Sequence, residues 1–289
     1  MSTTSWDLDL LPSEADVELY RERGYHVSPQ IIPDELLDAA LHGVERHFSG
    51  ERDFSLTITD GFSDWRPGDP KAFRNIEFLA LRNRQVKALA LCPVIGAIAA
   101  RLAGTDTIRL WDDQLVWKEP AHPGDNDAVV GWHTDRAYWM TCTSEEMLTA
   151  WIPLQDCPAE MGPLLVIDGS HRWGGTDDLR SFKSKDLDHV GLPIDAGDIA
   201  ERTRVLALTK GQVSFHHCRT IHGSGVNRTE SPRVSLAVHM QDGSNRWRRY
   251  LNPERIAWEL VNDRIARKLS DGTPDYTDPA AFPVIWSRG

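Results

Sequence analysis

The sequence has few cysteines, no long apolar run and no excess of positive charge. Its four cysteines, Cys92, Cys142, Cys157 and Cys218, are scattered and form no C-x-x-C pair. Neither a zinc knuckle nor a disulfide framework is indicated, so the cytoplasm is the expected location. No apolar run approaches the ~20 residues that cross a bilayer, and the N-terminal residues lack the basic-then-apolar pattern of a secretory signal. We therefore expect no membrane partner.

The formal net charge of −11 disfavours binding to nucleic acid, because neutralising phosphates requires clustered lysine and arginine. It says little about a substrate, since the charge of one cavity can oppose the net charge. The composition, 40% hydrophobic and 26% charged, is ordinary for a globular protein.

The hydrophobic pattern changes character near residue 107. Before it, amphipathic helices are expected at 14–23 and 33–48, and a helix or helix pair broken near Pro93 at 83–103. After it, branched and aromatic runs alternate with Gly, Pro and Asp turns, at 107–118, 130–139, 148–156, 163–168, 204–208, 211–217 and 233–241. Short strands without intervening helices favour an antiparallel sandwich or barrel. A last helix is expected at 253–268, followed by a tail that packs against the core.

Two polar stretches, 119–129 and 173–200, interrupt the predicted strands. Long loops inside a compact domain are usually functional or disordered. A lid over an active site and a mobile surface loop are both consistent with this pattern.

The tripeptide His133-Thr134-Asp135 carries the clearest chemical signal. Residues i and i+2 of a strand project to the same face, so His133 and Asp135 can reach one cation together. Two imidazoles and one carboxylate can bind a metal on one face and leave the other open, as in non-haem Fe(II) oxygenases. An H-x-D tripeptide is expected about once by chance in such a composition. The same residues are also compatible with buried histidines and a turn aspartate.

The third ligand must come from elsewhere in the chain. His222 is well placed for it, while His216 and His217 are rivals because they end the predicted strand after Gln212.

The wider set of motifs resembles the phytanoyl-CoA dioxygenase family. The matching segments, in order, are Glu22-Arg23-Gly24-Tyr25, residues 32–37, Gly131-Trp132-His133-Thr134-Asp135, residues 150–154, Gly162-Pro163-Leu164, Gly169-Ser170-His171, residues 222–229 and Arg233. The resemblance runs from about residue 15 to about residue 242. The Gly-Ser-Gly-x-Asn after His222 matches the family pattern around its distal ligand, which favours His222 over its rivals.

The resemblance implies roles for further residues. Arg233 would bind the distal carboxylate of 2-oxoglutarate, with Ser224 as helper; a planar, permanently charged guanidinium suits this task. Trp151 would flank the cosubstrate, and it can equally be a core aromatic. Lys118 ends a strand at a position where some relatives place a polar residue near the cosubstrate.

The implied fold is a double-stranded β-helix, a cupin-like jelly-roll barrel that is mainly β with flanking helices. We expect a single 2-oxoglutarate oxygenase domain over 1–289, with N-terminal helices in 1–105, a barrel core at about 106–242 and a C-terminal helix and tail in 243–289.

The implied function is an Fe(II)- and 2-oxoglutarate-dependent dioxygenase. It would use O2 to hydroxylate or otherwise oxidise an unactivated C–H bond of a small molecule, releasing succinate and CO2. Two alternatives are a cupin-like metal-dependent hydrolase or isomerase, which has no need of Arg233, and a non-catalytic small-molecule-binding barrel. Halogenation is disfavoured because Asp135 occupies the position that a halogenase leaves open for chloride.

The substrate is expected to be a small molecule, such as a secondary metabolite or an acyl or amino-acid derivative. Arg136, Tyr138 and Trp139 directly follow the metal motif and are candidates to line its cavity. The basic segment 245–249 is interpreted as a solvated turn rather than a substrate contact.

Overall fold

The computed structural model describes residues 10–191 and 196–288. The helices are α1 (Glu14–Arg23), α2 (Asp34–Phe48), α3 (Arg84–Ala90), α4 (Pro93–Ala103), α5 (Ala196–Arg202) and α6 (Val261–Ile265). Local sequence explains their ends: Ser13 and Asp16 form a capping box at α1, Gly24 ends it at a φ of 81°, and Pro93 is the first residue of α4. The three helical regions predicted before residue 107 are confirmed.

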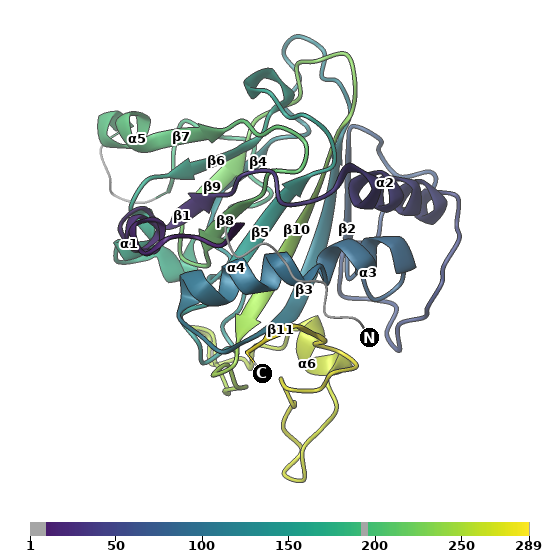
Figure 1. Ribbon diagram of the computed structural model, residues 1–289, viewed down its shortest axis with the longest axis vertical. Helices are drawn as coiled ribbons and strands as arrows, with labels where there is room; N and C mark the ends of the chain where they lie inside the picture. Colours follow the sequence, from purple (N-terminus) through teal and green to yellow (C-terminus); the bar gives the residue numbers. More distant parts are fainter. Residues whose placement is uncertain (1–9, 192–195, 289) are drawn as a thin grey trace.

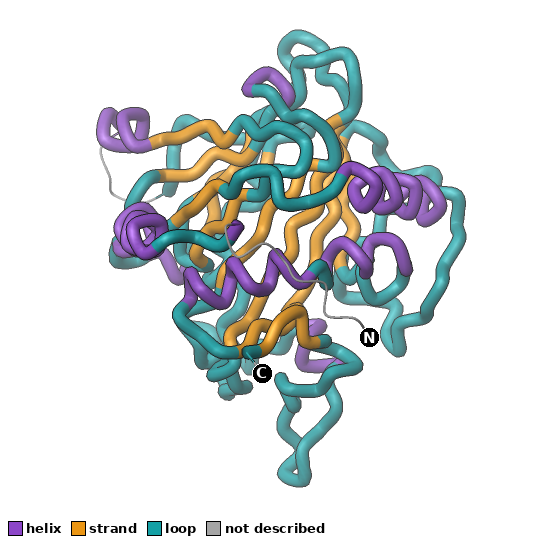
Figure 2. Tube along the Cα trace, in the orientation of Figure 1, coloured by secondary structure: helices purple, strands orange, loops and turns teal. Residues whose placement is uncertain are grey.

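The strands form two antiparallel sheets (Figures 1 and 2). The larger runs β1–β8–β5–β10–β3–β11 with β2 also paired to β3, and the smaller runs β4–β9–β6–β7. The bounds are β1 Tyr25–Val27, β2 Phe73–Glu77, β3 Thr107–Lys118, β4 Val130–His133, β5 Leu148–Pro153, β6 Leu164–Ile167, β7 Thr203–Leu206, β8 Ser214–His217, β9 His222–Ser224, β10 Arg233–Asp242 and β11 Val284–Ser287. This is the predicted jelly roll.

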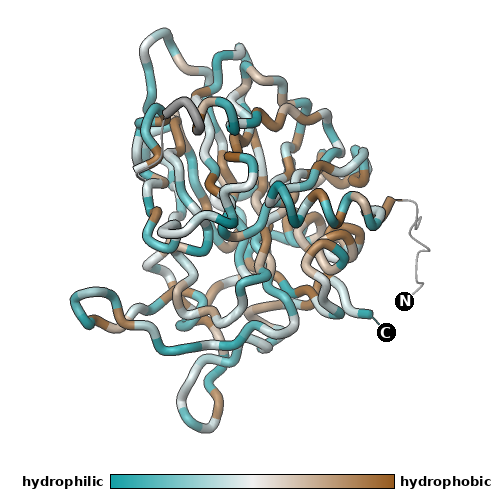
Figure 3. The backbone as a smooth tube through the Cα atoms, turned by 90° about the vertical axis from the view of Figure 1, so that its left-hand side faces the viewer, coloured by the Kyte–Doolittle hydropathy of each residue, from teal (hydrophilic) through white to brown (hydrophobic). Residues whose placement is uncertain are grey.

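Helices cover the outer face of the larger sheet. Figure 1 shows α4 lying across β3 and β10, with α2 and α3 beside it. The main apolar core lies between these helices and the sheet and includes Leu37, Ile95, Ile98, Leu115 and Phe215. In Figure 3 the hydrophobic segments accordingly concentrate within the body, whereas the projecting loops are mostly hydrophilic. This core packs against the outer face of the larger sheet, and other residues line its inner face.

The stretch Arg84–Ala103 is long and apolar enough to cross a membrane by length and composition alone. The expectation that no run approaches this length was therefore wrong. In the fold the stretch is divided into α3 and α4, and buried residues of α4 such as Ile95 and Ile98 belong to the main core. The stretch is apolar because its buried side chains pack in the core that covers the larger sheet.

The predicted helix at 253–268 was also wrong in extent, because only α6, Val261–Ile265, forms there. The preceding residues form a turn instead, in which the Asn252 side chain accepts a hydrogen bond from the Ile256 N–H and Arg255 takes a φ of 62°. The tail packs on the core as expected: Phe282 stacks on Trp111 with ring centroids 5.1 Å apart.

Candidate metal centre and active-site cavity

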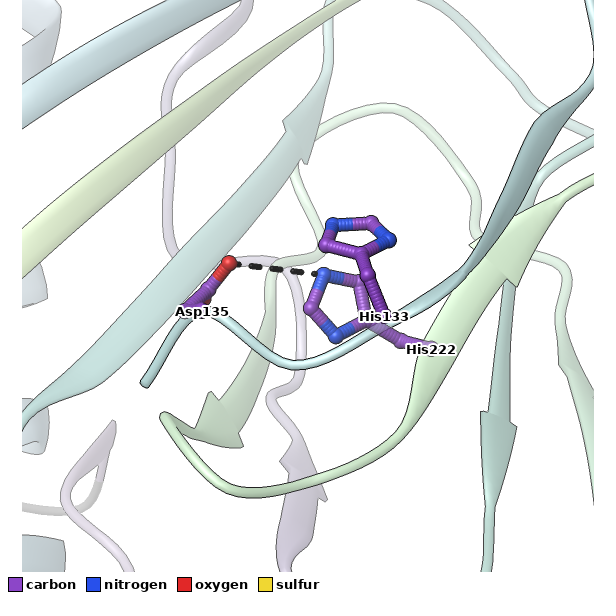
Figure 4. Close-up of side chains that lie close together, drawn as sticks. All are labelled: His133, Asp135 and His222. Carbon is purple, nitrogen blue, oxygen red and sulfur yellow. Dashed lines mark ion pairs between the residues drawn. The ribbon is translucent and has the colours of Figure 1, made fainter. Parts of the chain in front are cut away.

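His133, Asp135 and His222 come together between the two sheets. His133 ends β4, Asp135 follows two residues later, and His222 opens β9, where it is the cross-strand partner of His133. One potential ligand atom from each side chain lies within 4.8 Å of the others, and all three residues are buried. Figure 4 shows them converging, with Asp135 Oδ1 and His222 Nε2 3.6 Å apart. The structure thus assembles the set that the sequence singled out.

Backbone carbonyls orient both imidazoles. Nδ1 of His133 lies 2.8 Å from the carbonyl oxygen of Gly131, and Nδ1 of His222 lies 2.9 Å from that of Thr220. A proton on each Nδ1 satisfies these contacts and leaves each Nε2 lone pair available to a metal. Such outer partners commonly set the tautomer of a metal-binding histidine.

The protonation states also suit a cation. Burial lowers the pKa of His133 and brings that of His222 to about 4, so both rings are neutral near pH 7. Burial alone would raise the pKa of Asp135, but the surrounding His222, His239 and His216 outweigh it and hold that pKa well below its usual value. Neutral imidazoles and an ionised carboxylate are the forms that bind metal ions.

The second carboxylate oxygen of Asp135 is held away from the cluster. Thr149, on β5, donates a hydrogen bond to Oδ2 at 2.6 Å, and the same hydroxyl lies 2.8 Å from Nδ1 of His239 on β10. His216 Nε2 is 3.3 Å from Oδ2 as well. The carboxylate therefore presents mainly Oδ1 toward the two histidines. Sequence reasoning missed Thr149 and His239, although His239 is the one ionisable residue between Arg233 and Met240.

The two rival histidines occupy other positions. His216 lies on β8 of the larger sheet and contacts Asp135 from the side of Oδ2. His217 points to the opposite face, where its ring packs against His171 at 5.4 Å. Adjacent residues of a strand alternate between faces, so only one of the two can approach the centre.

A second feature is a pair of buried basic side chains, Arg233 in the cavity lining and Lys118 next to it. Arg233, the first residue of β10, is the cross-strand partner of Lys118 on β3. Nζ of Lys118 donates to Oγ of Ser224 at 2.6 Å and to the carbonyl of Gly225 at 2.7 Å. Burial lowers the pKa of Lys118 well below its usual value, with Arg233 adding to the effect.

Neither cation meets a carboxylate within the described part of the chain. Arg233 donates to the carbonyl of Gly162 at 3.3 Å, its Nε has no hydrogen-bond partner there, and its guanidinium lies 5.7 Å from the ring centroid of Trp151. Burial lowers the pKa of Arg233 to about 10. A buried charge without a partner is costly, so an anion placed beside these two side chains would be stabilised.

A cavity of about 580 Å³ extends from Arg233 to the cluster, and Lys118 is not among its lining residues. Its lining includes His133, Asp135, His222, Trp151, Ser224 and Arg233. The volume lies within the usual range for small-molecule sites. Of the other candidates, Tyr138 and Trp139 line it as expected. Arg136 does not, and that prediction was wrong: its buried guanidinium donates to the carbonyl oxygens of Trp139 and Cys142.

The loop that follows residue 173 forms part of the cavity wall through Arg180, Phe182 and Lys183. It lies directly on β4, where a Cβ on Gly131 would come within 2.2 Å of the carbonyl oxygen of Ser181. This close approach brings Phe182 against His133, with ring centroids 5.1 Å apart. Of the two polar stretches, this one therefore borders the metal cluster.

Comparison with known proteins gives the class. The model for the family described as phytanoyl-CoA dioxygenase (PhyH) matches residues 20–235. The protein is thus a non-haem iron- and 2-oxoglutarate-dependent dioxygenase. It belongs to the phytanoyl-CoA dioxygenase family.

Named relatives include the ectoine dioxygenase of Bordetella bronchiseptica, 26% identical over 272 residues that cover 89% of this chain and 82% of that protein. A probable alpha-ketoglutarate-dependent hypophosphite dioxygenase of Stutzerimonas stutzeri is 30% identical over 135 residues, 46% of this chain and 45% of that protein. This chain therefore aligns with less than half of the latter relative's length.

Among solved structures, the epimerase SnoN in complex with Fe3+, alpha ketoglutarate and nogalamycin RO superposes with a TM-score of 0.70 and 26% identity, covering 94% of this chain and 98% of that chain. EctD from S. alaskensis with 2-oxoglutarate and 5-hydroxyectoine gives a TM-score of 0.65 at 19% identity, covering 89% and 88%. The predicted family, fold class and enzyme class are confirmed. The hydrolase and non-catalytic alternatives are set aside.

Proposed function

We propose that His133, Asp135 and His222 bind the iron, and that the protein oxidises a C–H bond of a small organic molecule. The convergence of the three donor atoms within 4.8 Å, in the protonation states that metals require, carries this proposal. The cluster borders the cavity, so a substrate in the cavity has access to the open side of the metal.

Arg233 and Lys118 are proposed to hold 2-oxoglutarate. Arg233 pairs with the distal carboxylate, Lys118 adds a second positive charge, and Ser224 contributes a hydroxyl. Trp151 lies under the guanidinium and forms the apolar wall beside the cosubstrate. The supporting observation is that two neighbouring buried cations have no carboxylate partner among the residues described.

When bound, the iron and its cosubstrate supply O2-dependent oxidising power and release succinate and CO2. The chain's own contributions are positioning and exclusion of water. Thr149 donates a hydrogen bond to Asp135 Oδ2. The carbonyl oxygens of Gly131 and Thr220 orient the two histidines. The ring of Phe182, on the loop after residue 173, packs against His133. Hydroxylation is the default outcome, and desaturation or ring formation would need the same site.

The substrate is proposed to be a metabolite small enough for the cavity, and a cytoplasmic enzyme is proposed because all four cysteines are free and buried. Ectoine and a nogalamycin intermediate, named for the relatives, set the size range to be screened. A single catalytic domain over 1–289 remains part of the proposal.

Anaerobic titration with Fe(II) and 2-oxoglutarate tests the assignment. The weak visible band of the iron–2-oxoglutarate chelate should appear, and Arg233→Ala should raise the 2-oxoglutarate concentration required by about 10- to 100-fold, since one charge-assisted pair is worth about 1.5–3 kcal/mol.

Arg233→Lys should recover part of this affinity, because it keeps the charge but loses the bidentate fork. Arg228→Ala, which removes an exposed arginine, serves as the control and should leave the affinity unchanged. Absence of the band at saturating cosubstrate would reject the proposal.

A further inference from the structure

The cavity has a second polar wall, which carries carboxyl groups and other hydrogen-bond acceptors, whereas Arg233 supplies a donor elsewhere in the lining. It is built by alternate residues of adjacent strands: Asn75 and Glu77 on β2, Asp112 and Gln114 on β3, and His239 on β10. Alternation of side chains along each strand places all five on the inner face of the larger sheet. We refer to these five residues as the acceptor wall.

Its two carboxyl groups have no cationic partner. Within the described residues neither Glu77 nor Asp112 forms an ion pair with lysine or arginine. Glu77 Oε2 accepts one hydrogen bond from the Ser63 N–H at 2.6 Å, and Asp112 Oδ1 accepts one from the Asp113 N–H at 2.6 Å. The Phe78 N–H also acts on the Asp112 carboxyl, but no side chain of the described residues donates to either group.

The two carboxyl groups are close enough for the charge of one to disfavour ionisation of the other. Burial raises the pKa of Glu77. Burial raises the pKa of Asp112 well above its usual value, and the charge of Glu77 raises it further. A cation placed between them would offset both their repulsion and the cost of ionising two buried groups.

His239 supplies an independent acceptor in the same wall. The residue is only 9% exposed. The Thr149 hydroxyl has one proton, which it donates to Asp135, so it must accept from Nδ1–H of His239. A neutral His239 then carries its lone pair on Nε2, and no described residue donates to that atom. Since His239 lines the cavity, the wall offers an unfilled acceptor there.

Asn75 repeats this pattern farther along the wall. Its Oδ1 is buried and has no hydrogen-bond partner among the described residues. A buried acceptor without a donor is unfavourable unless a ligand supplies one. Two such acceptors and two carboxyl groups therefore line one wall.

Three further basic side chains line the cavity, and two of them form ion pairs with residues outside the acceptor wall. Arg180 pairs with Asp178 and stacks on Trp258. Arg264 pairs with Asp60. Lys183 is exposed on the loop and acts on Glu77 only at long range, because no contact within 4.0 Å forms.

We propose that the substrate carries a cationic nitrogen group, an amine, amidine or guanidine, which binds between Glu77 and Asp112 while His239 Nε2 accepts a neighbouring N–H or O–H. This inference rests on the proposed function, because it uses the same cavity. The cross-strand neighbour of Asp112 is His239, whose Nδ1 is 3.7 Å from Asp135 Oδ2. The oxidised carbon therefore lies close to the charged nitrogen rather than at the end of a long chain.

Butylguanidine and butylurea provide a matched pair of probes, since they share shape and differ in charge. Binding to the protein loaded with Fe(II) and 2-oxoglutarate is measured anaerobically by calorimetry and by the shift of the visible band. Butylguanidine should bind at least about tenfold more tightly than butylurea, the size expected for one charge-assisted hydrogen bond. Hypophosphite, an anion, should bind more weakly than either.

The double variant Glu77→Gln/Asp112→Asn should abolish the preference for butylguanidine while the dissociation constants for Fe(II) and 2-oxoglutarate stay within about twofold, because the anion site and the metal cluster are untouched. Glu254→Gln/Asp271→Asn changes the net charge equally at exposed positions and should keep the preference. Lys183→Gln should leave the preference unchanged; a marked increase there would show that Glu77 pairs with Lys183 in the wild-type protein.

Equal binding of the two probes to the wild-type protein overturns the inference, whether or not the double variant folds. A screen of amines, neutral compounds and anions for stimulated succinate release gives a second readout, in which the active compounds should be cations. If the visible band never forms but butylguanidine is still preferred, the proposed function fails and the cation site stands.

Discussion

Replacing Thr149 by valine tests how the protein orients Asp135, the carboxylate proposed to bind the metal. Valine has nearly the same shape but lacks the hydroxyl that donates to Asp135 Oδ2 at 2.6 Å and contacts His239 at 2.8 Å. A buried hydrogen bond to a charged acceptor is worth about 1.5–3 kcal/mol. Since about 1.4 kcal/mol is a factor of ten, iron binding should weaken by about 10- to 100-fold.

Competition with a chromogenic Fe(II) chelator under anaerobic conditions measures this effect. Thr149→Ser is the matched control, because serine keeps the hydroxyl and should bind iron within about threefold of the wild type. Thermal unfolding of the metal-free variants separates a loss of iron affinity from a loss of fold. If Thr149→Val bound iron as tightly as the serine variant, the hydroxyl would have no role in orienting Asp135.

Three further predictions address the ligand set, the loop and the pH dependence. Asp135→Ala should retain weak iron binding through the two histidines yet lose 2-oxoglutarate-dependent substrate oxidation; full turnover would mean that the carboxylate is wrongly assigned. Gly131→Ala should lose about 1–3 kcal/mol of stability in urea, because the new Cβ would meet the Ser181 carbonyl at 2.2 Å. A loss below about 0.5 kcal/mol would show that the loop moves aside freely.

Burial lowers the pKa of His217 to about 3, against about 6.5 in an unfolded chain. The unfolded state therefore binds a proton first as the pH falls, so the metal-free protein should lose stability from about pH 6.5 downward. His217→Gln should flatten that decline in urea unfolding measured between about pH 5 and 7, and an unchanged slope would contradict the shift.

Local patterns were sufficient for much of the fold. The helices at 14–23 and 33–48 have their starts and ends in nearby residues such as Ser13, Gly24 and Pro33, and β3 matches the predicted 107–118. The segment at 253–268 failed because the turn around Asn252 and Ile256 competes with the helix. β2 and β11 were not predicted either, since both depend on pairing with the outer edge of β3, which is remote in sequence.

The sequence by itself indicated that His133 and Asp135 can reach one cation, because they are two residues apart; the predicted strand over 130–139 was too long, since β4 ends at His133 and Asp135 lies in the bend that follows. The sequence also supplied Arg233 and Lys118 as candidate partners of a carboxylate. The motif after His222 already favoured this residue over His216, but only the tertiary structure gives the reason that His222 faces His133: β9 pairs with β4, whereas β8 belongs to the other sheet. The same packing joined Thr149 and His239 to Asp135, and Glu77 to Asp112 in one wall. Such contacts depend on strand register between distant segments, which no local pattern encodes.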